Sequence, residues 1–88
     1  MNYRLDITKR AQEDIAFHKK SGEKSVLNKI AVLLNELTEH PFSGAGKTEP
    51  LKHKFSDMWS RRINREHRLV YEVLEKAVVV HDAKEYYE

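Results

Sequence analysis

One segment of this 88-residue chain, residues 47–71, combines cations with an isolated carboxylate in strand-like sequence. It contains Glu49, Lys52, Arg62 and Arg68. A guanidinium donates hydrogen bonds in a planar fork that matches phosphate oxygens, and a lysine adds a point charge. A carboxylate among such cations stays ionised and can accept a proton. This combination suits cleavage of an RNA phosphodiester, in which a ribose 2′-hydroxyl attacks the neighbouring phosphate and no metal is required.

A purely structural interpretation of the same residues stays open at this point. Glu49 can instead pair with Lys47 or Lys52 at the surface, which would stabilise the fold by at most about 1 kcal/mol. His53 follows Lys52 and could contact a substrate phosphate or simply lie in solvent.

The five histidines show no spacing typical of a metal site, and the chain has no cysteine to join them. We therefore expect no metal and no cofactor. Tyr86 and Tyr87, close to the C-terminus, either stack on bases or anchor the end of the chain to the sheet.

Positive charge is concentrated in the segment that holds these residues. Residues 45–68 contain seven Lys and Arg against three acidic residues, whereas residues 69–88 contain two against five. A local basic field attracts polyanions, although a solvated sheet face would have the same composition.

The elements that must position these residues follow from the apolar pattern. Residues 2–7 alternate as in a strand, and Thr8 is a candidate N-cap for a helix that ends at Ser21-Gly22. A second helix is expected from Glu23 to His40. Its apolar stripe is wide enough to cover one face of a sheet and consists of Val26, Ile30, Leu33 and Leu37.

Four further strands are expected, over residues 51–55, 58–64, 67–74 and 77–82. The order β-α-α-β-β-β-β predicts an α+β fold in which two N-terminal helices pack on one face of an antiparallel sheet.

Strand parity places the arginines. Leu69, Tyr71 and Val73 share one face of their strand, so Arg68 must lie on the other. The same rule separates Arg62 from Trp59 and Ile63. If the helices cover the apolar face, both arginines project from the open face.

The chain as a whole is short enough for a single domain over residues 1–88. Charges interrupt every apolar stretch near the N-terminus, and no apolar run is long enough to span a membrane. A cytoplasmic protein is therefore expected.

The motifs of the central segment resemble the YoeB/Txe family of bacterial toxins, within the RelE-like superfamily. The resemblance rests on Pro41-Phe42, on Glu49-Pro50-Leu51-Lys52-His53, on Trp59-Ser60-Arg61-Arg62-Ile63 and on Glu66-His67-Arg68-Leu69-Val70-Tyr71. It implies the toxin of a type II toxin–antitoxin pair, a ribosome-dependent endoribonuclease that cuts messenger RNA in the A site. It also implies an antitoxin partner of the YefM/Axe kind, and a homodimer is compatible with it.

The resemblance assigns roles by motif. Glu49 is the general base, Arg68 stabilises the transition-state phosphate, and Lys52 and Arg62 contact substrate phosphates. The family has a histidine as general acid near its C-terminus, but no histidine follows His81 here and Tyr86 occupies the corresponding position.

Because tyrosine is a weaker acid than histidine, slower or tyrosine-assisted chemistry is expected. Two alternatives remain: a catalytically weakened module that only binds an antitoxin, and a ParE-like inhibitor of a topoisomerase.

Overall fold

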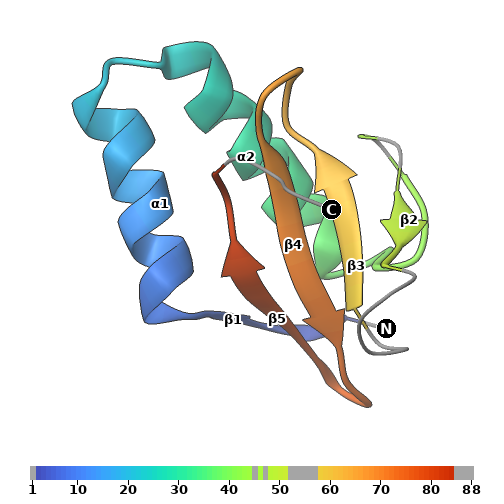
Figure 1. Cartoon of the computed structure of the whole chain (residues 1–88). Coiled ribbons are helices and arrows are strands. Elements are labelled where there is room, and N and C mark those ends of the chain that lie inside the picture. The colour runs from blue at the N-terminus through green and yellow to red at the C-terminus, as the bar shows by residue number, and fades with distance from the viewer. Residues whose placement is uncertain (1, 45, 47, 52–57, 85–88) are drawn as a thin grey trace.

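The computed structural model describes residues 2–44, 46, 48–51 and 58–84. Five strands form one sheet in the order β1-β5-β4-β3-β2, and two helices follow β1 in the chain (Figure 1). The strands are β1 (Arg4–Ile7), β2 (Glu49–Pro50), β3 (Met58–Arg62), β4 (Arg68–Val73) and β5 (Ala77–Asp82). The helices are α1 (Lys9–Lys20) and α2 (Lys24–Leu37).

The predicted α+β fold is confirmed, with one difference in the sheet. β2 to β5 pair antiparallel, but β1 pairs parallel to β5, so the sheet is mixed. Alternation within residues 2–7 predicts a strand and its inward face, but it does not determine which strand becomes the neighbour.

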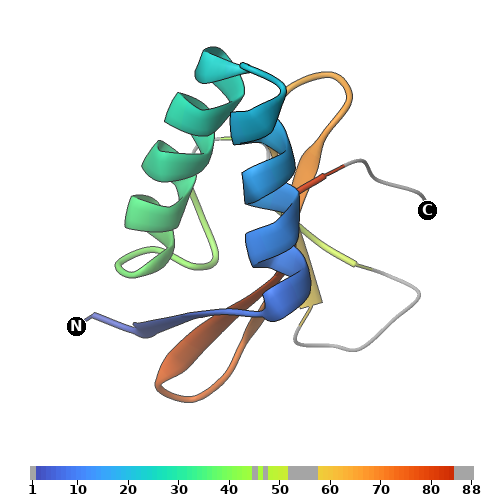
Figure 2. The ribbon, with the colours of Figure 1, turned by 90° about the vertical axis from the view of Figure 1, so that its left-hand side faces the viewer.

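The helices cover one face of the sheet, as expected (Figure 2). Their apolar stripe, which includes Ile30 and Leu33, packs against Leu69, Tyr71 and Val80 in a single core. Among the described residues, no helix lies on the opposite face of the sheet, which is called the open face below.

Local signals explain where α1 begins and ends. The Thr8 side chain accepts a hydrogen bond from the Ala11 amide, which satisfies one of the orphan donors of the first turn. Ser21 caps the other end, and Gly22 follows with φ of 72°, a conformation that favours glycine. The predicted N-cap at Thr8 and the predicted end of the helix at Ser21-Gly22 are both confirmed.

The second helix is shorter than predicted and ends at Leu37 instead of His40. His40 precedes Pro41, and the residue before a proline is disfavoured in the helical conformation. The backbone oxygens of His40 and Ser43 instead accept hydrogen bonds from the guanidinium of the buried Arg61. Of the strand predicted over residues 51–55, only Leu51 is described, and it follows β2 (Glu49–Pro50) without belonging to it; residues 52–57 lie outside the described part of the chain, so the rest of this prediction stays untested.

Candidate active site

Sheet register places Glu49 and Arg68 on the open face. Glu49 lies directly opposite Ser60 on β3, and Arg68 lies opposite Arg62. Opposite residues of an antiparallel pair point to the same side, and so do residues two apart along a strand. Because Tyr71 is buried under the helices, Ser60, Arg62 and Arg68 belong to the other side, and Glu49 joins them there.

Glu49 and Arg68 are in contact. Nη2 of Arg68 lies 3.3 Å from Oε1 of Glu49. Nε of Arg68 donates to the Ser60 hydroxyl at 3.1 Å, which holds the guanidinium extended over β3 toward β2. The Arg68 side chain is only 10% exposed, whereas that of Glu49 is 59% exposed, so the carboxylate is accessible beside a well-held cation.

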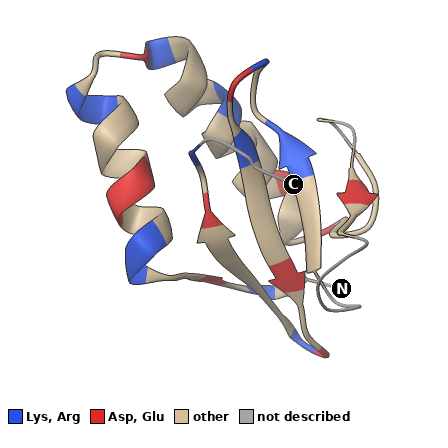
Figure 3. Ribbon diagram, in the orientation of Figure 1, with Lys and Arg blue, Asp and Glu red and all other residues tan. Residues whose placement is uncertain are grey.

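Arg62 adds a second cation. It lies on the neighbouring strand directly opposite Arg68, and its side chain is exposed. Side chains in this relation have Cβ atoms about 4.5–5.5 Å apart, and like charges placed there repel each other. A bound anion would relieve this repulsion. Figure 3 shows Lys and Arg gathered at the end of the sheet where β3 ends and β4 begins.

The other predicted site residues cannot be placed. Lys52, His53, Tyr86 and Tyr87 lie outside the described residues, so their positions relative to Glu49 and Arg68 stay predictions. Within the described ranges, no group of three or more His, Asp or Glu side chains is arranged to hold a metal ion.

Sequence reasoning missed Arg61, which lies beside Arg62 in the chain but points to the opposite face. Its side chain is fully buried, and Nη1 pairs with Glu36 Oε1 at 2.9 Å. Nη2 donates to the Ser43 carbonyl at 2.7 Å and to that of His40. The sequence did contain a signal for this burial. Arg61 is two residues from both Trp59 and Ile63, so the alternation of side chains along a strand places it with them on the helix side of the sheet.

Arg61 thereby determines the path of the segment that leads to Glu49. Its contacts hold α2 and residues 40–43 against β3, and Gly46 next accepts a hydrogen bond from the Arg62 amide. Gly46 has φ of 86°, and an added Cβ would come within 2.8 Å of the Arg62 carbonyl oxygen. A residue with a side chain would therefore displace this segment.

Tyr71 completes this buried network. Its hydroxyl accepts from Arg61 Nε at 3.2 Å and donates to the Pro41 carbonyl at 2.7 Å. Burial raises the pKa of the Tyr71 phenol above its ordinary value of 10.0, and the hydrogen bond and charge of Arg61 oppose this shift.

The raised pKa of Tyr71 leads to a pH-dependence prediction. Above the ordinary value of 10.0, the folded state keeps a proton that the unfolded chain loses, so the free energy of unfolding falls as the pH rises. Urea unfolding at about pH 9 and about pH 11 should therefore show a larger loss of stability for the parent than for Tyr71→Phe. Equal losses would show that Tyr71 contributes nothing to this dependence.

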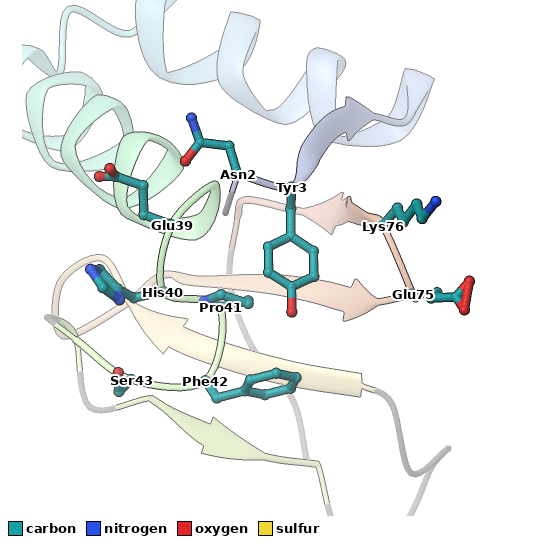
Figure 4. A pocket seen from close by; sticks show the side chains of 9 residues that line it. All are labelled: Asn2, Tyr3, Glu39, His40, Pro41, Phe42, Ser43, Glu75 and Lys76. Atoms are coloured by element: carbon teal, nitrogen blue, oxygen red, sulfur yellow. The ribbon is translucent and has the colours of Figure 1, made fainter.

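A hollow on the described surface lies away from these residues. A pocket of about 610 Å³ is bounded by the aromatic rings of Tyr3 and Phe42, by Pro41, and by Glu75 and Lys76 at the turn after β4 (Figure 4). It does not include Glu49 or Arg68. The candidate active site lies on the open face of the sheet, away from this pocket.

Comparison with known proteins identifies the family. A family model described as the YoeB-like toxin of the bacterial type II toxin–antitoxin system matches residues 7–87. Toxin YoeB of Escherichia coli (strain K12) is 43% identical over 65 residues, which are 74% of this chain and 77% of the relative.

Solved structures agree with this match. The YoeB dimer from Staphylococcus aureus superposes with a TM-score of 0.86 at 32% identity, covering 99% of this chain and 100% of the other. A YoeB–YefM complex from the same organism gives 0.82 at 32% identity with the same coverage. The chain is thus a toxin of a bacterial type II toxin–antitoxin system. It belongs to the YoeB-like family.

Proposed function

We propose that this toxin is an endoribonuclease that cleaves messenger RNA in the ribosomal A site and so inhibits translation. The contact between Glu49 and Arg68 carries the proposal, because it unites a proton acceptor and a phosphate-binding cation on one accessible surface. Membership of the YoeB-like family supports the same reaction class.

In the proposed reaction, Glu49 removes the proton from a ribose 2′-hydroxyl, and the resulting oxygen attacks the adjacent phosphate. Arg68 donates hydrogen bonds to the phosphate oxygens as negative charge accumulates on them in the transition state. Ser60 keeps the Arg68 guanidinium in place during this step. Arg62 and Lys52 bind neighbouring phosphates, and His53 is a further candidate for such a contact.

The leaving 5′-oxygen needs a proton, and Tyr86 is the proposed donor. The products are then a 2′,3′-cyclic phosphate, or the 3′-phosphate derived from it, and a 5′-hydroxyl. In this scheme the guanidinium supplies the charge stabilisation that a metal ion provides in other nucleases. Tyr87 is proposed to stack on a base of the bound codon.

We further propose that the chain binds a YefM-like antitoxin. S. aureus YoeB forms a complex with YefM, and in this chain Lys and Arg gather at the end of the sheet where β3 ends and β4 begins (Figure 3). An acidic, disordered antitoxin segment would complement the open face. A homodimer is proposed on the likeness to the S. aureus YoeB dimer. Of the helices in the described part, none is long and apolar enough to cross a membrane.

Mapping cut ends on translating ribosomes tests the proposed activity. Purified toxin should cut the codon in the A site, leave a 5′-hydroxyl on the downstream fragment, and leave ribosomal RNA intact. A Tyr86→His variant should cut faster if the tyrosine limits proton transfer to the leaving group. No cleavage by the parent together with strong cleavage by Tyr86→His would instead favour a weakened, antitoxin-binding module.

A further inference from the structure

Strands β3, β4 and β5 border a hollow that the proposed cleavage step does not use. It measures about 520 Å³, which is within the usual range of pockets for small ligands. Its walls combine charged, polar and apolar side chains: Thr8, Arg10, Met58, Glu72, His81 and Asp82. This hollow is called the β5 pocket below.

Sheet register places the β5 pocket on the open face. Glu72 lies between Tyr71 and Val73 on β4, and both of these neighbours are buried in the core under the helices. Side chains alternate along a strand, so Glu72 points away from the helices. Met58 lies directly opposite Glu72 on β3 and therefore faces the same side.

An irregularity in β5 brings two further side chains to this side. Val80 packs in the core, and Asp82 lies opposite Val70, so β5 carries one residue in excess between them, His81. Nε2 of His81 lies 3.0 Å from Oε1 of Glu72, and the His81 side chain therefore faces the open side as well. Bulges of this kind re-aim side chains and are frequent beside active sites.

Both carboxylates of the β5 pocket have a partner that leaves room for a ligand. Nε of Arg10 lies 2.8 Å from Oδ1 of Asp82, and Nε2 of His81 donates to Oε1 of Glu72, because a carboxylate only accepts. These pairs weaken the repulsion between the pocket and RNA phosphates. Oε2 of Glu72 makes no hydrogen bond with a described residue, and the Glu72 side chain is 32% exposed. This carboxylate can therefore accept further hydrogen bonds.

The β5 pocket adjoins the candidate active site. Met58 is two residues from Ser60, whose hydroxyl accepts a hydrogen bond from Arg68. Glu72 is likewise two residues from Val70, the residue opposite Ser60. Two residues of a strand cover about 7 Å. An RNA strand held at Arg68 thus has a neighbouring nucleotide within reach of the pocket.

We propose that the β5 pocket binds the base of a nucleotide next to the cleaved linkage and selects guanine. Guanine is the base whose Watson–Crick edge presents two adjacent N–H donors, N1–H and the 2-amino group, and the two oxygens of the Glu72 carboxylate can accept both. Adenine and cytosine present an acceptor nitrogen beside their amino group, which the carboxylate repels. The Met58 thioether provides a favourable contact for an aromatic ring.

His81 is a positioning residue in this inference, because it acts on the base through Glu72. The inference deepens the proposed function and rests on it, since it assigns a base preference to the same RNA-cleaving surface.

Binding can be tested without cleavage. The probes are 2′-deoxy trinucleotides with one deoxyguanosine or one deoxyinosine, which lacks the 2-amino group, between two deoxyuridines. In an NMR titration the parent should bind the guanine probe about threefold or more tightly than the inosine probe, with shifts at the Glu72 and His81 amides. Glu72→Gln should bind both probes equally. The control Glu75→Gln, at an exposed position after β4, should keep the difference.

Cleavage on programmed ribosomes is the second test. Guanosine, inosine and adenosine are placed in turn at each position that flanks the mapped cut. At one of these positions the parent should cut the guanosine codon about tenfold faster than the adenosine codon, with inosine between them. Each ratio compares two codons cut by the same protein, so a general loss of stability does not change it.

The variants should change this ratio in a definite order. It should fall close to one in Glu72→Gln and fall in part in His81→Phe, in which no N–H donor holds the carboxylate. His81→Gln retains a donor and should restore part of the preference.

The outcomes separate the inference from the proposed function. A parent that cuts RNA without preferring guanosine at any flanking position, or a preference unchanged in Glu72→Gln, would overturn the inference and leave the proposed function intact. Equal binding of the two probes by the parent would show that Glu72 and His81 only join β4 to β5. A parent that cuts no RNA would overturn the proposed function, and the titration would still decide whether the pocket binds guanine.

Discussion

Replacing Glu49 with glutamine is expected to slow codon cleavage by about a hundred- to ten-thousandfold, because the amide keeps the size of the side chain but cannot accept the 2′-hydroxyl proton. Arg68→Ala should lower the rate by about a hundred- to a thousandfold, the usual effect of removing one group that stabilises transition-state charge. Both are measured as single-turnover rates on programmed ribosomes.

Matched controls exist for both substitutions. Glu75→Gln removes an exposed carboxylate at the turn between β4 and β5, and Arg65→Ala removes an exposed guanidinium at the tip of the β3–β4 hairpin. Both should cut at nearly the parental rate. Since Glu49 and Arg68 would act on one phosphate, the double variant should lose less than the two separate losses combined. Parental rates in Glu49→Gln and Arg68→Ala would remove these residues from the mechanism.

The largest expected effect on stability comes from Arg61. Arg61→Met keeps an unbranched chain in the core but removes every donor that the guanidinium provides. The carbonyl oxygens of His40 and Ser43 and the Tyr71 hydroxyl then lose a partner, at about 1–3 kcal/mol for each group that stays buried. The Glu36 side chain is 33% exposed, so water can replace the guanidinium beside its carboxylate, and the loss of this ion pair lowers the free energy of unfolding by less. We expect a total of about 3–5 kcal/mol, the range typical of breaking a buried ion pair.

Arg62→Met is the control for this measurement, because the same change is made one residue away on the exposed side of the same strand. It should alter the free energy of unfolding by less than about 0.5 kcal/mol. Both variants are compared with the parent by urea unfolding, with the slope of each transition checked for constancy. A loss at Arg61 no larger than that at Arg62 would show that the network does not support the loop before β2.

Much of the fold was predictable because its determinants are local. Thr8 is followed by a helical sequence and caps it, and the spacing of Ile30 and Leu33 alone indicates which side of α2 is buried. Parity within β4 likewise separates Arg68 from Tyr71. Such features depend on residues a few positions apart, whose relation the backbone geometry determines.

The unpredicted features depend on residues far apart in the sequence. β1 lies beside β5 although more than sixty positions separate Leu5 from its partner Val78. Asp14 and His18 of α1 contact the backbone of Ala83 across a similar separation. Arg61 is the instructive case, because parity already put it on the buried side, whereas its charge suggested the surface. Only the arrangement of α2 and residues 40–43 supplies the acceptors that make this burial tolerable.

The central proposal is that Glu49 activates a ribose 2′-hydroxyl next to a phosphate held by Arg68. The most direct test is a messenger RNA with a single 2′-deoxy nucleotide at the mapped cleavage position, presented in the A site of a programmed ribosome. The account predicts that this codon resists the toxin, while the toxin binds the complex as well as before. Cleavage of the deoxy-substituted codon at the rate of the all-ribose codon would contradict it.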